Sequence, residues 1–221
     1  MTMTAPEHLA VALTAGLTFP AQAAEMAAAC SVRAERSVSE RKAPADAEAI
    51  VAFWRDAGPS RWFAKDADFD RAFRERFLWL HERAACEALP AWLETPIGSL
   101  ALAILLDQFP RNAFRGTARM YATDALARQV ADTAFASGHD HRIEADLRLF
   151  LYIPFAHSED LRDQERSVAL ARTVGEPILS HAKRHREIIR RFGRFPHRNP
   201  ILGRTMTQEE HRYLAEGGFS G

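Results

Sequence analysis

The sequence lacks the features that mark several large classes of protein. It has two cysteines in 221 residues, Cys30 and Cys86, and no Cys-x-x-Cys pair, so it has neither a disulfide framework nor a zinc or dithiol motif. We therefore expect a reducing compartment, the cytoplasm. Basic and acidic residues are equal in number, at 29 each, and this lack of a basic excess predicts no nucleic-acid partner.

Long apolar runs are also missing. The longest, from Leu100 to Leu106, is far shorter than the ~20 residues that a membrane span needs, so we expect no membrane partner. Near the N-terminus, a mildly apolar stretch and the triplet Ala21-Gln22-Ala23 resemble a signal peptide. The positively charged start of a signal peptide is missing, because the preceding segment contains Glu7 and has no Lys or Arg. We predict that residues 1–43 form a disordered or weakly helical tail.

What the sequence does contain is helical periodicity. One face of a helix, with Asp66 or Asp68 as its cap, is indicated by the stripe Phe69, Phe73, Phe77 and Leu80. Thr95-Pro96 is typical of a helix start, and the residues from there to Leu106 are apolar on nearly all sides. A helix of that composition has to be buried, so we expect it at the centre of the fold.

Punctuation residues divide the remainder into further helices. Thr123-Asp124 and Asp140 are expected to cap two of them, Pro154 to stop the second, and Ser158 to cap the next. The segment 207–210 has the pattern of a capping box. No stretch alternates with strand periodicity, so residues 44–221 are predicted to form a single all-α domain. We expect about eight helices in antiparallel hairpins around the buried central helix.

Two polar signatures interrupt this pattern, Asp107-Gln108-Phe109-Pro110-Arg111-Asn112 and Gly193-Arg194-Phe195-Pro196-His197-Arg198-Asn199. Each comes after a helix and contains a proline, so they predict two similar helix exits that face a shared space. Asp107 falls near a buried face and needs a partner there, because a lone buried carboxylate is destabilising by several kcal/mol. Arg111, Arg115 and Arg119 are the candidates.

Histidines supply the other candidate groups. His157 lies beside Ser158 and Glu159, and we interpret Ser158 as a cap rather than a nucleophile, because adjacent side chains rarely aim at each other. His181 and His185 have a spacing that can bind a metal, but no acidic motif accompanies them, and His185 lies on an apolar stripe. We expect no metal and no cofactor.

The quoted motifs, together with Phe53-Trp54, Trp62-Phe63, the stretch 152–159, and Gly203-Arg204, resemble the bacterial family catalogued as domain of unknown function 924. The resemblance extends from about residue 45 to the C-terminus. It implies a tetratricopeptide-repeat-like all-α fold and implies no activity.

The sequence supports two hypotheses of function. In the first, a pocket binds a small anionic molecule. If the protein is an enzyme, the same pocket would also transform that molecule. Its acid–base residues would be Asp107, His157, Glu159 and His197. Its ligand-binding residues would be Arg111, Asn112, Gln164, His185, Arg194, Arg198 and Asn199. In the second, stacked helices form a scaffold for a protein or peptide partner, and the polar motifs are structural. The motifs also fit plain turn chemistry. The sequence leaves the oligomeric state and the existence of any activity open.

Overall fold

The computed structural model describes residues 43–221. The expected tail and its signal-like stretch fall on residues 1–42 and lie outside the described residues. Residues 43–221 contain no β-strand, so the predicted all-α fold is confirmed. Within the same range, no helix is both long and apolar enough to span a bilayer.

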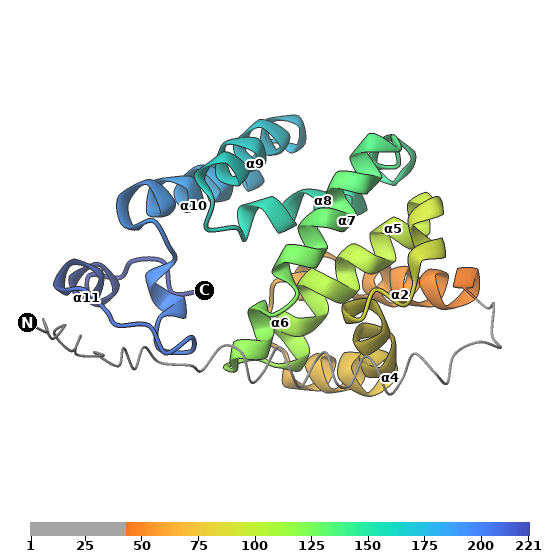
Figure 1. The fold of residues 1–221 in the computed structure, drawn as a ribbon, viewed down its shortest axis with the longest axis horizontal. Helices are drawn as coiled ribbons and strands as arrows, with labels where there is room; N and C mark the ends of the chain where they lie inside the picture. The colour runs from red at the N-terminus through yellow and green to blue at the C-terminus, as the bar shows by residue number, and fades with distance from the viewer. Residues whose placement is uncertain (1–42) are drawn as a thin grey trace, which may run out of the picture. The chain divides into compact units, whose positions relative to one another are not determined.

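Eight α-helices of eight or more residues make up most of this fold (Figure 1). They are α2 (Ala43–Ala57), α4 (Ala67–Ala85), α5 (Pro96–Ala103), α7 (Asp124–Ala136), α8 (Ala145–Ala156), α9 (Leu161–Val174), α10 (Ile178–Phe192) and α11 (Gln208–Ala215). Shorter turns connect them, and these are α3 (Pro59–Trp62), η1 (Pro90–Glu94), η2 (Ile104–Gln108), α6 (Phe109–Ala113), η3 (Ala118–Tyr121), η4 (Asp140–Arg142) and η5 (Pro196–Arg198).

The largest hydrophobic core lies among α2, α4, α5, α7 and α8. The predicted stripe of α4 is buried, with Phe73 completely inaccessible and in edge-on contact with Phe109. Asp66 caps this helix, because its side chain accepts hydrogen bonds from the backbone N–H groups of Asp68 and Phe69. Periodicity and capping therefore place α4 as the sequence predicts.

The predicted central helix is also present and buried. Thr95 caps it by accepting a hydrogen bond from the Gly98 N–H, and the chain then stays helical through α5, η2 and α6. Its middle part, η2, is a π-helical segment, in which the Phe109 N–H bonds to the Ile104 carbonyl five residues earlier. A π turn adds one residue to a helix and re-aims the side chains around it.

Three predicted helix boundaries are wrong. Pro154 does not stop α8, which continues to Ala156; in its last turn the proline removes only one backbone donor. Asp140 lies in the turn η4 instead of capping α8, which begins at Ala145. Ser158 does not cap α9. The cap is Asp160, whose carboxylate accepts from the Arg162 N–H, while the Ser158 hydroxyl accepts from the Asp160 N–H.

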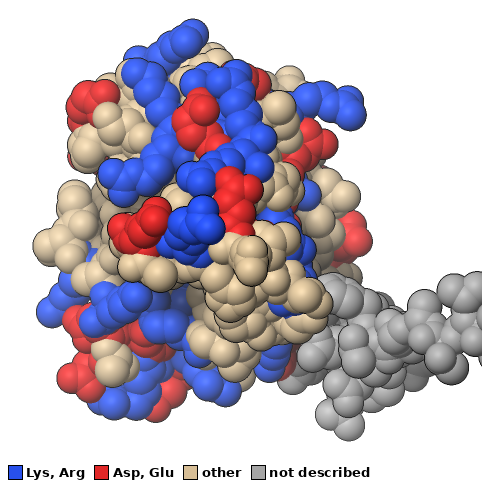
Figure 2. Space-filling view, turned by 90° about the vertical axis from the view of Figure 1, so that its left-hand side faces the viewer, with Lys and Arg blue, Asp and Glu red and all other residues tan. Residues whose placement is uncertain are grey.

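The C-terminal part packs α9 against α10, which lie side by side in Figure 1. The predicted capping box of α11 is present, with Thr207 and Glu210 exchanging side-chain and backbone hydrogen bonds. Basic residues of α10 form ion pairs with glutamates, among them Arg190 with Glu165 and Arg191 with Glu209. Figure 2 shows this side of the molecule, where Lys and Arg cover much of the upper part and separate Asp and Glu side chains lie between them.

Candidate functional site

The π-helical segment η2 leaves backbone carbonyls without their usual helical partners, and side chains satisfy them. The Leu105 carbonyl accepts from Nδ1 of His81 at 2.8 Å, and the Leu106 carbonyl accepts from the Thr123 hydroxyl. The Asp107 carbonyl accepts from Arg111 at 2.7 Å. Pro110 has no N–H of its own to offer these carbonyls. The segment is thus held by groups from α4 and from the start of α7.

The Asp107 carboxylate is fully buried and hydrogen-bonded on both oxygens. Oδ1 accepts from Nδ1 of His157 at 2.7 Å, and Oδ2 accepts from the Gln108 amide at 2.6 Å. A nitrogen of Arg111 lies 3.3 Å from Oδ1. Burial raises the pKa of Asp107, but Arg111 and His157 outweigh that effect and bring the pKa below its usual value. Asp107 is therefore ionised inside the protein.

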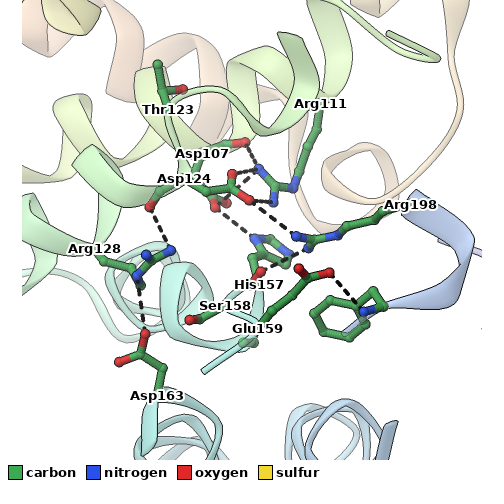
Figure 3. Close-up of polar contacts among 12 residues, drawn as sticks. Asp107, Arg111, Thr123, Asp124, Arg128, His157, Ser158, Glu159, Asp163 and Arg198 are labelled. Carbon is green, nitrogen blue, oxygen red and sulfur yellow. Dashed lines mark hydrogen bonds and ion pairs between the residues drawn. The ribbon is translucent and has the colours of Figure 1, made fainter. Parts of the chain in front are cut away.

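Of the three candidate partners predicted for Asp107, Arg111 is the one that contacts it, and Arg111 also has a second partner. Its guanidinium makes two hydrogen bonds to the Asp124 carboxylate, at 2.8 and 3.1 Å (Figure 3). The other two candidates lie elsewhere, since Arg115 pairs with Asp70 and Arg119 stacks on Phe114. Both terminal nitrogens of Arg111 thus already donate to protein oxygens.

His157 ends α8 and points toward the first signature (Figure 3). Because Nδ1 donates to Asp107, the neutral ring presents Nε2 as an acceptor. Among the described residues, the hydrogen bond of this ring is the one made by Nδ1. Burial and Arg111 lower the pKa of His157, and Asp107 raises it in part. Such an imidazole can accept a proton from a ligand and return it.

Arg198 comes from the second signature and is only 6% exposed. Its guanidinium carbon lies 4.5 Å from the ring centres of both Tyr121 and Phe195. One nitrogen donates to the His157 carbonyl at 2.9 Å, and another lies 3.6 Å from Asp124, beyond hydrogen-bonding distance. Its Nε is buried and has no partner among residues 43–221. Burial lowers the pKa of Arg198 because these contacts compensate the charge incompletely.

Two further histidines lie near Arg198. Burial lowers the pKa of His197 to about 4, and its Nδ1 has no partner in the described part of the chain. Burial also lowers the pKa of His185 to about 3, and its Nδ1 donates to the Ala156 carbonyl at 3.1 Å. Both rings are therefore neutral near pH 7.

A cavity of about 460 Å³ joins these groups. This volume lies in the range of roughly 300–1,000 Å³ that is usual for small-molecule sites. The predicted site residues that line it come from both signatures and from α8 and α10, and they are Arg111, Asn112, His157, His185, His197 and Arg198. The two signatures thus face one space.

Five predicted site residues do not line the cavity. Asp107 lies behind His157. The Gln164 amide donates to the carbonyls of Ala156 and Ser158 at 2.9 and 2.7 Å and so fixes the end of α8. Glu159 accepts from the Phe195 N–H and from Arg204, each within about 3 Å.

Arg194 and Asn199, the remaining two, contact Glu210 instead of the cavity. Arg194 makes two hydrogen bonds to that carboxylate, at 2.6 and 2.8 Å, and Asn199 donates to it at 3.2 Å. Glu210 is 2% exposed, and its pKa is lowered to about 2, chiefly by Arg194. This cluster attaches α11 to the second signature.

The sequence gives little indication of three other groups at the site: Asp124, Tyr121 and Gln108. Asp124 belongs to a pair predicted only to cap a helix, yet the Thr123 side chain makes no cap bond and Asp124 binds Arg111. An Asp placed twelve residues after the first signature carries no signal of that contact.

Among residues 43–221, no cluster of His, Cys, Asp and Glu could hold a metal ion.

Comparison with known proteins places the chain in a family. No curated protein matches it. It is similar to the solved structure of a protein of unknown function from Agrobacterium tumefaciens, with 55% sequence identity, a TM-score of 0.77, and coverage of 78% of this chain and 98% of that one. The family model described as "Bacterial protein of unknown function (DUF924)" matches residues 50–218. The chain therefore belongs to the bacterial DUF924 family, as its motifs indicate.

Proposed function

We propose that the cavity binds a small anionic molecule and that Arg198 is the group that contacts its negative charge. The observation that carries this proposal is the state of Arg198, which is buried, lines the cavity and keeps Nε without a partner in the described structure. A buried charged donor without an acceptor is unfavourable by roughly 1–3 kcal/mol or more, and an anionic ligand would relieve that penalty.

The charges around the cavity support the same assignment. The charged side chains that line it are all basic: Lys65, Arg111, Arg115 and Arg198. Arg111 and Arg115 are held by Asp124 and Asp70, which leaves Arg198 as the buried cation with spare hydrogen-bonding capacity.

His157 supports an extension of the proposal from binding to proton transfer. Asp107 fixes its tautomer and orientation, and Nε2 is left for the ligand. The alternative, an interaction scaffold, requires polar motifs that are mutually satisfied with no cavity between them. The shared cavity and the partnerless nitrogens at Arg198 and His197 favour the ligand site.

The test is a thermal-shift screen of anionic metabolites, both carboxylates and phosphates. A ligand at about 100 times its Kd stabilises the folded protein by about 2.7 kcal/mol, which is a Tm increase of roughly 5–10 °C for a protein of this size. Arg198→Gln should lose the shift, and Arg198→Lys should retain part of it.

The matched control is Arg162→Gln, because the side chain of Arg162 is 96% exposed and does not line the cavity. Circular dichroism establishes that each variant is folded before ligand is added. Equal shifts in wild type, Arg162→Gln and Arg198→Gln would remove Arg198 from the proposal. The absence of a shift with any anion would contradict the proposal itself.

A further inference from the structure

The cavity has an apolar wall as well as a polar one. The apolar wall comes from α3, α8, α9 and α10, and includes Trp62, Leu149, Ile153, Ala171 and Ile178. The polar wall comes from the two signatures, Arg115, Tyr121 and His157, while Ser167, His181 and His185 lie among the apolar residues of α9 and α10. A ligand that fills such a space must bury hydrocarbon against the first wall and place its polar group at the second.

The buried charges limit how negative that polar group can be. Two cations, the partly buried Arg111 and the buried Arg198, already face two buried anions, Asp107 and Asp124. The neighbouring His197 is neutral near pH 7, because burial lowers its pKa to about 4. Lys65 lies at the exposed edge, where water screens its charge. A second negative charge on the ligand would therefore meet Asp124 and Asp107 without a further buried cation to offset it.

We propose that the ligand is a monocarboxylate with an apolar body, an aliphatic chain or an aromatic ring. Its carboxylate binds at Arg198 and His197, and its body packs against Trp62, Leu149 and Ile153. This inference rests on the proposed function, since it requires an anion at Arg198, and it adds the single charge and the hydrocarbon part. Phosphates, dicarboxylates and short polar anions are predicted to bind weakly.

The experiment is isothermal titration calorimetry of the full chain with acetate, butyrate, hexanoate and benzoate. The comparison probes are hexanamide, which has no charge, succinate, which carries two negative charges, and inorganic phosphate, which carries between one and two near pH 7. Each buried methylene group should tighten binding about fourfold, so hexanoate, which has four more of them than acetate, should bind roughly 250-fold more tightly. Hexanamide, phosphate and succinate should each bind at least about tenfold more weakly than hexanoate.

Two variants separate the two walls. Arg198→Gln should weaken hexanoate binding and leave hexanamide binding unchanged. Ile153→Ala should weaken hexanoate more than acetate. Arg162→Gln is the control and should bind like the wild type.

The outcomes distinguish this inference from the proposed function. If phosphate or succinate binds as tightly as hexanoate and Arg198→Gln abolishes that binding, the anion site stands and the monocarboxylate assignment is overturned. If affinity does not depend on chain length, the apolar body is wrong. If hexanamide and hexanoate bind equally and Arg198→Gln changes neither, both proposals fail.

Discussion

Asp107 and His157 are fifty positions apart in the chain, and a hydrogen bond of 2.7 Å joins Oδ1 of the first to Nδ1 of the second. The π-helical segment η2 supplies the carboxylate, and the residue that ends α8 supplies the ring. Two segments that are distant in sequence thus share one buried polar contact. The pair links the fold to the candidate site, because the same carboxylate holds Arg111 and orients the histidine.

Asp107→Asn should lower the free energy of unfolding by about 3 kcal/mol, because it removes one partner from a buried ion pair with Arg111. It should also lower the pKa of His157, since the Asp107 charge raises that pKa. Urea denaturation and NMR titration of the ring measure the two effects. The control Asp163→Asn breaks the half-exposed pair with Arg128 and should change stability by less than about 1 kcal/mol. Equal losses in the two variants would refute a special role for Asp107.

Thr123→Val should lower stability by about 1–3 kcal/mol, because it leaves the buried Leu106 carbonyl without its side-chain donor. Valine has the shape of threonine, so the change tests the hydroxyl alone. Thr133→Val is the matched control within α7, since the exposed Thr133 hydroxyl bonds only to the carbonyl four residues earlier. Thermal denaturation should separate the two variants clearly, and a neutral Thr123→Val would show that the π-helical segment does not depend on this bond.

The stability of the protein should fall as the pH drops from about 6.5 to about 4. Burial lowers the folded-state pKa of His81 and of His197 to about 4, whereas the unfolded chain has a histidine pKa near 6.5. The unfolded state therefore binds more protons in this window, and each such histidine lowers the unfolding free energy by up to about 1.4 kcal/mol per pH unit.

The measurement is urea unfolding at several pH values. His197→Gln should show a smaller pH slope than the wild type. His141→Gln, at a side chain that is 79% exposed, is the control. An unaltered slope in His197→Gln would contradict a buried neutral ring at that position.

Glu210→Gln should loosen the attachment of α11, because it weakens the hydrogen bonds from Arg194 and Asn199. We expect a loss of about 2 kcal/mol, as for other charge-assisted hydrogen bonds, and faster amide exchange across residues 204–215. Its neighbour Glu209 forms an exposed pair with Arg191, so Glu209→Gln should change exchange little. Identical exchange in both variants would argue against this anchor.

Much of the fold could be predicted from the sequence because local rules decide it. The stripe of α4, the Asp66 cap and the capping box of α11 each depend on residues within a few positions of one another. The boundary predicted from Pro154 is wrong by less than one turn, because α8 continues past this proline to Ala156. The π-helical segment has no local signal, and it is stabilised by contacts from His81 and Thr123.

The candidate site could be predicted in part. His157, Arg198 and His197 stand out as polar residues in defined turns, and all three line the cavity. Arg194 has the same chemistry, yet it contacts Glu210 on α11, which the sequence does not reveal. The apolar wall at Ile153 could not be recognised either, since a cavity wall and a packed core have the same composition.

The π-helical segment also constrains how this chain can change its length. Deleting one residue between Ile104 and Gln108 would let the segment close as an ordinary α-helix. The π turn absorbs this extra residue, so the helical parts before and after it would keep their relative rotation, and the side chains within the segment would be re-aimed. Asp107 would then no longer face both His157 and Gln108. A chain shorter by one residue here would have a more regular helix and no aligned acid–histidine pair.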